Sequence, residues 1–174
     1  MVLDDVLLAL LGGHDSSAWE LRQRHDEIFG SARRMDIVRV MAAVTRLERS
    51  GFLRVDAAVP ARMASGNRRT CSLTATGRQR QRSWLCDLAP DVSIEDVYVR
   101  GMLAVETADE ATFEVFIRNG LAVTRARMHA LADDTAGAAA VTRAKDAFER
   151  ESVRALALWL HQLPDHRVPR SAAG

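Results

Sequence analysis

The residues of this 174-residue chain that could do chemistry are above all its arginines, which make up 23 of its 24 basic residues. Residues 1–86 hold 14 Arg against 9 acidic residues, whereas residues 87–174 hold 10 basic against 14 acidic residues. A planar guanidinium can bind a phosphate, or the edge of a guanine, through two parallel hydrogen bonds. Codon usage in a G- and C-rich genome would raise the arginine content, but it does not explain the uneven placement. We therefore interpret the first half as a module that faces a polyanion.

The first group of arginines lies on a helix predicted from Met35 to Ser50. Helical periodicity places one set of side chains on the side expected to be buried: Ile37, Val40, Met41, Val44 and Leu47. The opposite side is left with Arg39, Ala42, Ala43, Arg46 and Arg49, and Arg33 and Arg34 stand at the entrance of the helix. Small residues between arginines would let such a helix approach the major groove of DNA closely.

The second group flanks a predicted β-hairpin. Residues 52–59 and 69–73 have strand-like patterns, and Ala64-Ser65-Gly66-Asn67 between them is typical of a turn. Arg62, Arg68 and Arg69 lie around this tip, where arginines could enter a narrow minor groove. Any one of these arginines could be an ordinary solvated charge. Their coincidence on two elements favours double-stranded DNA as the partner.

Two further helices are expected before the arginine-bearing one. The first covers residues 2–11 and is stopped by Gly12-Gly13, and the second is capped by Ser16 or Ser17, with Glu20 in capping-box position, and ends at Gly30. The expected apolar stripe of the second helix includes Trp19 or Ala18. Three short helices followed by a hairpin predict a mainly α-helical fold with a small β-hairpin wing, a winged helix-turn-helix.

Two runs of residues resemble motifs of the PadR family of transcriptional regulators. Residues 43–53, AVTRLERSGFL, resemble that family's "RLE-x-x-G-L" segment, and residues 66–77, GNRRTCSLTATG, resemble its wing return "R-x-Y-x-LT-x-x-G". The resemblance spans about residues 3–160 and implies a DNA-binding regulator, commonly a repressor. The sequence departs from the family where Val40 and Met41 replace a Tyr-Pro pair and Cys71 replaces the wing tyrosine. A MarR-like ligand-responsive regulator, and a winged-helix protein-interaction module without DNA binding, are the alternatives.

The second half is predicted to be entirely helical. Segments at residues 94–105, 107–132 and 138–163 carry apolar stripes, with Thr107 expected to cap the second of them and Pro164 to end the third. Two long amphipathic helices need an apolar partner, so we expect a homodimer, which would bind a palindromic operator. The expected domains are residues 1–88 for DNA binding and 92–164 for dimerisation, with a loose tail at 165–174.

Large apolar side chains in the same region allow a hydrophobic or aromatic effector to bind. The candidate effector residues are Trp84, Met102, Phe113, Phe116, Phe148 and Trp159. These side chains equally fit plain core and dimer packing, and both interpretations stay open at this point.

Other kinds of site are disfavoured by the sequence. It contains neither a glycine-rich phosphate loop nor a G-x-S-x-G motif, and its five histidines are scattered. We therefore expect no enzyme activity, no catalytic residue, no cofactor and no metal site. Cys71 and Cys86 lack the spacing of a metal site or disulfide framework, and Cys71 is expected to pack under the hairpin. Without an apolar run long enough to span a bilayer and without an export signal, the chain is expected to be cytoplasmic.

Overall fold

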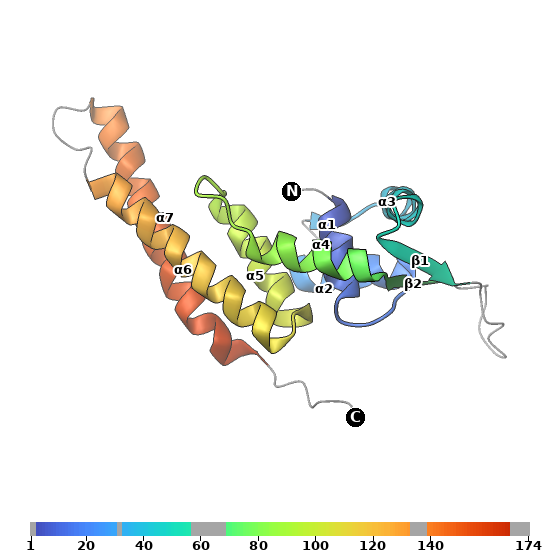
Figure 1. Cartoon of the computed structure of the whole chain (residues 1–174). Helices are drawn as coiled ribbons and strands as arrows, with labels where there is room; N and C mark the ends of the chain where they lie inside the picture. The colour runs from blue at the N-terminus through green and yellow to red at the C-terminus, as the bar shows by residue number, and fades with distance from the viewer. Residues whose placement is uncertain (1–2, 31–32, 57–68, 133–138, 168–174) are drawn as a thin grey trace. The chain divides into compact units, whose positions relative to one another are not determined.

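The computed structural model describes residues 3–30, 33–56, 69–132 and 139–167. The described elements are α1 (Leu3–Leu11), α2 (Ala18–Phe29), α3 (Ile37–Arg49), β1 (Leu53–Asp56), β2 (Thr70–Leu73), α4 (Ala75–Cys86), α5 (Ile94–Thr107), α6 (Glu110–Ala132), α7 (Ala140–Gln162) and the 3-10 turn η2 (Leu163–His166). The fold is mainly helical with one small antiparallel hairpin (Figure 1), which confirms the predicted fold class. Internal packing divides the chain into unit 1, Met1–Leu85 with Glu106–Ala108, and unit 2, Cys86–Val105 with Asp109–Gly174.

Helix α1 forms the centre of unit 1. Every residue from Val6 to Leu10 is 0% exposed, and α2, α3 and β2 all pack against this helix. The buried carboxylate of Asp5 on α1 pairs with Arg80 of α4 at 2.8 Å, and the Arg80 guanidinium lies over the ring of Phe52. This pair joins α4 to the core of the unit, since the cost of burying Asp5 is offset only if the opposite charge stays beside it.

Helix α2 begins and ends as its sequence predicts. The Ser17 hydroxyl accepts from the Glu20 N–H and the Glu20 carboxylate accepts from the Ser17 N–H, a complete capping box, and Gly30 follows the helix with a φ of 74°. Of the two alternatives predicted for the apolar stripe, Trp19 is 48% exposed and Ala18 is half-buried, so the stripe does not include Trp19. The buried side chains of α2 are Leu21 and His25, which lie four residues apart on one face.

Gly51 ends α3 and turns the chain into the hairpin. Its φ of 73° allows a Schellman motif, in which the Phe52 N–H donates to the Leu47 carbonyl at 3.0 Å and the Gly51 N–H to the Glu48 carbonyl at 2.9 Å. The Gly51 carbonyl then accepts from the hydroxyls of Thr74 and Thr76 at 2.7 and 3.0 Å. We call this meeting of residues 51–52 with residues 74–77 the Gly51–Gly77 junction.

The same junction starts α4. Thr74 is the N-cap of α4, since its hydroxyl accepts from the Gly77 N–H at 3.1 Å, and its own N–H donates to the Phe52 carbonyl at 3.1 Å. A Cβ atom on Gly77 would lie 1.8 Å from the Phe52 carbonyl oxygen. Only glycine at residue 77 permits this approach. Thr74, Thr76 and Gly77 therefore hold the end of α3, the hairpin and the start of α4 together.

The hairpin is short and is anchored in the unit. Strand β1 pairs antiparallel with β2 in the register Leu53 with Leu73 and Val55 with Cys71, and Ser16, before α2, adds a bridge to Cys71. Leu53, Cys71 and Leu73 are buried, as the core face of a strand pair requires. The predicted turn of the hairpin lies outside the described residues.

Unit 2 is built around the long pair α6 and α7, which run antiparallel alongside each other (Figure 1). The start of α6 differs from the prediction. Thr107 ends α5, and it is Asp109 whose carboxylate accepts from the Thr112 N–H at 2.8 Å at the beginning of α6. An aspartate three residues before Thr112 meets the geometry of a cap, whereas Thr107 is too far from the first helical turn.

The apolar side chains of α7 and η2 lie on two faces. Leu156 and Leu163 are buried together with Val153 and Leu160, but Val141, Phe148 and Leu158 are 82, 76 and 60% exposed. Ala144 and Ala155 are also exposed on this second face. The helix therefore carries one apolar face inside unit 2 and a further apolar face directed to its surface. The end of α7 continues into η2, and Arg167 pairs with Glu110, so the folded part extends past the predicted start of the tail at residue 165.

Substitutions in the Gly51–Gly77 junction should separate the effect of the close backbone approach at Gly77 from that of the positive φ at Gly51. Gly77→Ala places a methyl group on the Phe52 backbone, and we expect it to lower the free energy of unfolding by about 3 kcal/mol. Gly51→Ala meets open space and is strained only by its positive φ, so about 1 kcal/mol is expected. Urea unfolding measures both, with Ser83→Ala on the exposed side of α4 as the control. Equal stability of Gly77→Ala and the unmodified chain would contradict the role of the close approach.

Candidate nucleic-acid interface

The helix α3 has one buried and one exposed face, as a DNA-reading helix requires. Its buried side chains are Val40, Ala43, Val44 and Leu47, spaced at three and four residues. Two of the predicted positions are exchanged: Met41 is 58% exposed and Ala43 is 0% exposed. Ala43 lies three residues after Val40 and four before Leu47, so it falls on the face that packs on the core of unit 1, and Met41 does not. The exposed face is formed by Val38, Arg39, Met41, Ala42, Thr45, Arg46 and Arg49.

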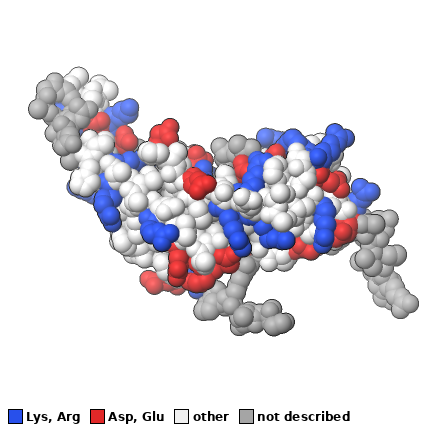
Figure 2. Space-filling model, viewed as in Figure 1, with Lys and Arg blue, Asp and Glu red and all other residues white. Residues whose placement is uncertain are grey.

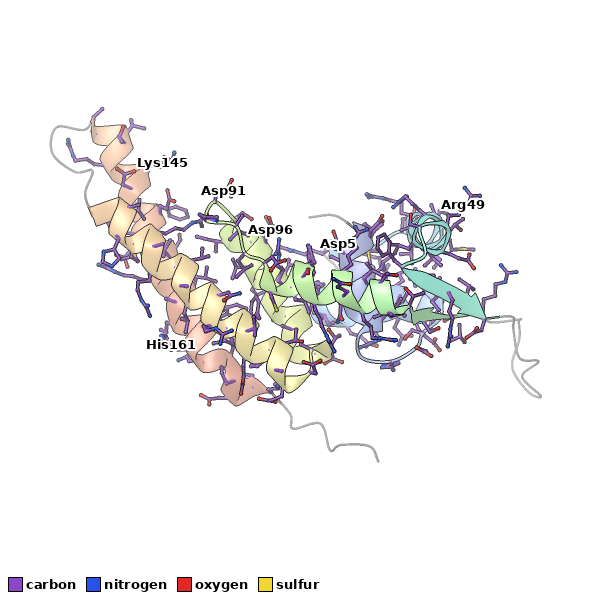
Figure 3. All side chains as sticks on the ribbon, viewed as in Figure 1. Asp5, Arg49, Asp91, Asp96, Lys145 and His161 are labelled. Atoms are coloured by element: carbon purple, nitrogen blue, oxygen red, sulfur yellow. The ribbon has the colours of Figure 1, made fainter. Side chains whose placement is uncertain are left out.

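Basic side chains gather along this part of unit 1. Figure 2 shows Lys and Arg atoms concentrated over the edge where Figure 1 draws α3, and Arg49, labelled in Figure 3, projects from the outer side of that helix. Arg39 and Arg49 are exposed, and so is Arg69, which immediately precedes β2. The structure thus places Arg39, Arg46 and Arg69 at the surface, while Arg62 and Arg68 lie outside the described residues.

The N-terminus of α3 is fixed by two carboxylates. Asp36 is its N-cap and accepts from the Val38 N–H at 2.9 Å, and Asp26 of α2 accepts from the Met35 N–H at 3.4 Å. Asp26 also pairs with Arg34 at 3.5 Å, and the Arg34 side chain remains 69% exposed. Arg33, which precedes it, is half-buried. The pairing with Asp26 holds Arg34 next to the first turn of α3.

Arg46 has a partner within unit 1 that its sequence position does not show. Its Nε donates to the Asp4 carboxylate at 2.9 Å, and its second nitrogen makes a closer contact with the other carboxylate oxygen. Hydrogen bonding to Asp4, followed by the opposite charge, raises the pKa of the Arg46 guanidinium. A phosphate at Arg46 has to share or displace this carboxylate, so Arg46 is a weaker candidate contact than Arg39.

Arg54 on β1 is a further candidate that the sequence patterns did not single out. Its side chain is 70% exposed, and its Nε donates to the Ser72 hydroxyl on the paired strand at 2.8 Å. Strand alternation placed it on the outer face, but only the observed register shows that it is held there by the neighbouring strand.

The candidate effector residues lie in different surroundings within the described chain. Phe116 is 0% exposed, and the ring of Trp159 packs over Gly101 and lies 5.6 Å from the ring of Tyr98. Met102 is half-buried on α5, and Phe148 is on the exposed face of α7. Phe113 does line a groove of about 560 Å³ along α6. Trp84 lies half-buried on α4. An effector site formed by these residues stays a prediction.

Metal binding and membrane insertion find little support in the described residues. No three His, Cys, Asp or Glu side chains gather there as a metal site would need. None of the helices in the described ranges is long and apolar enough to cross a membrane. Cys71 is 1% exposed beneath the hairpin, where burial, with smaller contributions from Glu48 and Asp15, raises the pKa of its thiol to about 11.

No family model and no curated protein matches the chain. Among solved structures, the chain is similar to Bacillus subtilis PadR in complex with operator DNA, at 16% identity and a TM-score of 0.44. The similarity covers 93% of this chain and 97% of that one.

The buried thiol of Cys71 should resist alkylation in the folded protein. With a pKa two units above the usual 9, its thiolate fraction at pH 8 falls roughly a hundredfold, and burial blocks access as well. A Cys86→Ser variant leaves Cys71 as the single thiol, and mass spectrometry after iodoacetamide treatment follows its reaction. We expect modification in urea and almost none without it. Rapid modification of the folded variant would contradict the position of Cys71 in the core.

Proposed function

We propose that this chain is a DNA-binding transcriptional regulator that reads double-stranded DNA with the exposed face of α3. The proposal rests on the observation that α3 has one buried face and one exposed face that carries arginines. Its buried face is fixed on α1, while Arg39, Ala42 and Arg49 are directed to solvent beside the entrance arginines. A major groove accepts one helix, and small residues such as Ala42 leave room for the backbone to approach.

The hairpin is suited to a second contact. The Gly51–Gly77 junction fixes β1 and β2 next to the end of α3, and both Arg54 on β1 and Arg69, immediately before β2, are exposed. Contacts from a helix and a hairpin of one rigid unit would set the register on the duplex, because phosphate contacts position a protein and base contacts specify sequence. Arg62 and Arg68 belong to the same proposal on their sequence positions alone.

We propose further that the regulator acts as a homodimer formed through unit 2. Its α7 has an exposed apolar face, and the groove along α6 has an apolar floor of Phe113, Ile117 and Leu121. Glu110 and Glu114 line the N-terminal part of this groove and Arg118 and Arg125 the C-terminal part. In two copies related by a two-fold axis, the acidic end of one groove would face the basic end of the other. The charges of this surface are therefore complementary to those of a second copy. Repression of transcription is the outcome that we propose for such a dimer.

A second candidate is a protein-interaction module, favoured by the exposure of Val38 and Met41 on α3 at 69 and 58%. Apolar side chains on this face could contact thymine methyl groups, but they could equally dock on a protein. The two functions differ in their dependence on salt, which separates them experimentally.

DNA binding should be strongly salt-dependent and should depend on Arg39. We expect the affinity for labelled duplex from upstream of the chain's own gene to fall steeply between about 50 and 200 mM salt, because phosphate contacts release counterions. Arg39→Gln should weaken binding and reduce the slope of log K against log salt by about 1. Arg127→Gln in unit 2 is the control with the same loss of charge and should change neither. Absence of binding at low salt would overturn the proposal and favour the protein-interaction module.

Charges placed on the proposed dimer surface should yield monomers. Phe148→Asp and Leu121→Asp put a carboxylate on an apolar surface, one on each helix, without touching a fully buried residue. Sedimentation equilibrium should show a dimer for the unmodified chain and for Ser83→Asp, an exposed position on α4, and a monomer for the two variants. An unmodified chain that remains monomeric at micromolar concentration would contradict the proposed assembly.

A further inference from the structure

The exposed face of α3 has an apolar centre. Val38 and Met41 are 69 and 58% exposed, and Ala42 and Thr45 beside them are exposed as well. Val38, Ala42 and Thr45 follow one another at spacings of four and three residues, which aligns them along the helix. Met41, three residues after Val38 and four before Thr45, lies next to this line. The side chains that fix α3 on its core lie on the opposite side of the helix. The part of α3 that is directed away from unit 1 is therefore apolar over about two turns.

This apolar centre offers no side-chain hydrogen bond to a base. The side chains of Val38, Met41 and Ala42 carry no N–H or O–H group. The hydroxyl of Thr45 donates to the Met41 carbonyl of its own helix at 3.1 Å, so its hydrogen is already used. A partner that lies against these four residues meets mainly methyl and methylene groups.

The arginines of α3 stand around the centre rather than in it. Arg39 and Arg46, seven residues apart, lie along one flank, and Arg49 lies at the C-terminal end. Nε and a terminal nitrogen of Arg46 bind the two carboxylate oxygens of Asp4. These are the paired donors that a guanine would need for its O6 and N7 atoms. Reading of guanine by Arg46 would therefore require this pair to separate.

The charges of the same face favour a polyanion over an apolar protein surface. Within α3, all of which the structure describes, the exposed charged residues are Arg39, Arg46, Glu48 and Arg49. Arg34, just before the helix, adds a guanidinium that is 69% exposed. An apolar strip with a basic surround is complementary to a major groove, where apolar groups of the bases lie between two rows of phosphates.

We propose that Val38 and Met41 determine the sequence preference of this chain by packing against the 5-methyl groups of thymine, while Arg39 contacts the neighbouring phosphates. Thymine presents the one apolar group among the four bases in the major groove. A G·C pair at the same place would leave base donors and acceptors against methyl groups, without hydrogen-bond partners, which costs affinity. Recognition helices place their N-terminal residues against base edges, and both residues lie in the first two turns of α3. The inference rests on the proposed function, because it names the base that the same face reads.

The test removes the methyl groups without changing the base pairing. The tightest-binding duplex is selected with the full chain from a library of random sequence, and thymine should be enriched in it. This duplex is then made once with thymine and once with uracil, which pairs with adenine but lacks the 5-methyl group. We expect the uracil duplex to bind at least about fourfold more weakly, the effect of one lost methyl contact. Equal affinity for the two duplexes would overturn the inference and leave the proposed function standing.

Variants assign the methyl contact to α3. Val38→Ala and Met41→Ala shorten exposed side chains, and circular dichroism verifies that both variants are folded. Each should weaken binding of the thymine duplex and reduce the difference between the two duplexes at least about twofold, because the partners of one contact are not additive. Arg39→Gln should weaken both duplexes by the same factor, since a phosphate contact does not depend on the base. Ser83→Ala, at an exposed position of α4, is the control and should change neither. A difference between the duplexes that persists in Val38→Ala combined with Met41→Ala would overturn the assignment to these residues.

A third duplex identifies the groove. Inosine–cytosine pairs in place of A·T resemble A·T in the minor groove, because inosine lacks the guanine amino group, but resemble G·C in the major groove. We expect this duplex to bind at least about fourfold more weakly than the thymine duplex. Retained affinity would place the recognition in the minor groove and overturn the inference. Absence of binding to every duplex at low salt would overturn the proposed function, and the inference with it, so the two failures are distinguishable.

Discussion

The arrangement of unit 1 depends on the close approach of Gly77 to the Phe52 carbonyl. Because no side chain separates the two backbones, the Thr74 and Thr76 hydroxyls can reach the Gly51 carbonyl, and Gly51 can end α3 with a positive φ. These few bonds join the last turn of α3 to the hairpin and to the first turn of α4. A side chain at residue 77 would push these three elements apart. The direction of α3 relative to the hairpin is therefore set by backbone contacts more than by its exposed side chains.

Because α3 is held by its buried face and by the Gly51–Gly77 junction, most of its exposed side chains are not needed to hold the helix in place. Val40, Ala43, Val44 and Leu47 hold the helix on its core, so the other side chains can serve recognition. Arg46 is the exception, since Asp4 ties it to α1. At the opposite end, Asp36 and Asp26 fix the first turn and leave a pocket between α1, α2 and α3 that arginines line.

Local chemistry made several features predictable from sequence. The capping box of Ser17 and Glu20 and the stop at Gly30 depend on residues close in the chain, and both are confirmed. Features that depend on distant neighbours were not predicted. The pairing of Arg46 with Asp4 and the burial of His25 are decided by packing of α1 and α2. The cap at Asp109 was missed because α5 extends further than its apolar pattern suggested.

The central claim is that the exposed face of α3 meets DNA, and photo-cross-linking tests it most directly. A photoreactive amino acid is introduced at Val38 or Ala42 on this face, and at the exposed Val141 of α7 as the control. We predict cross-links to bases of a bound duplex from positions 38 and 42 and none from position 141, at a salt concentration where the unmodified chain binds. Cross-links from position 141, with none from α3, would contradict the claim.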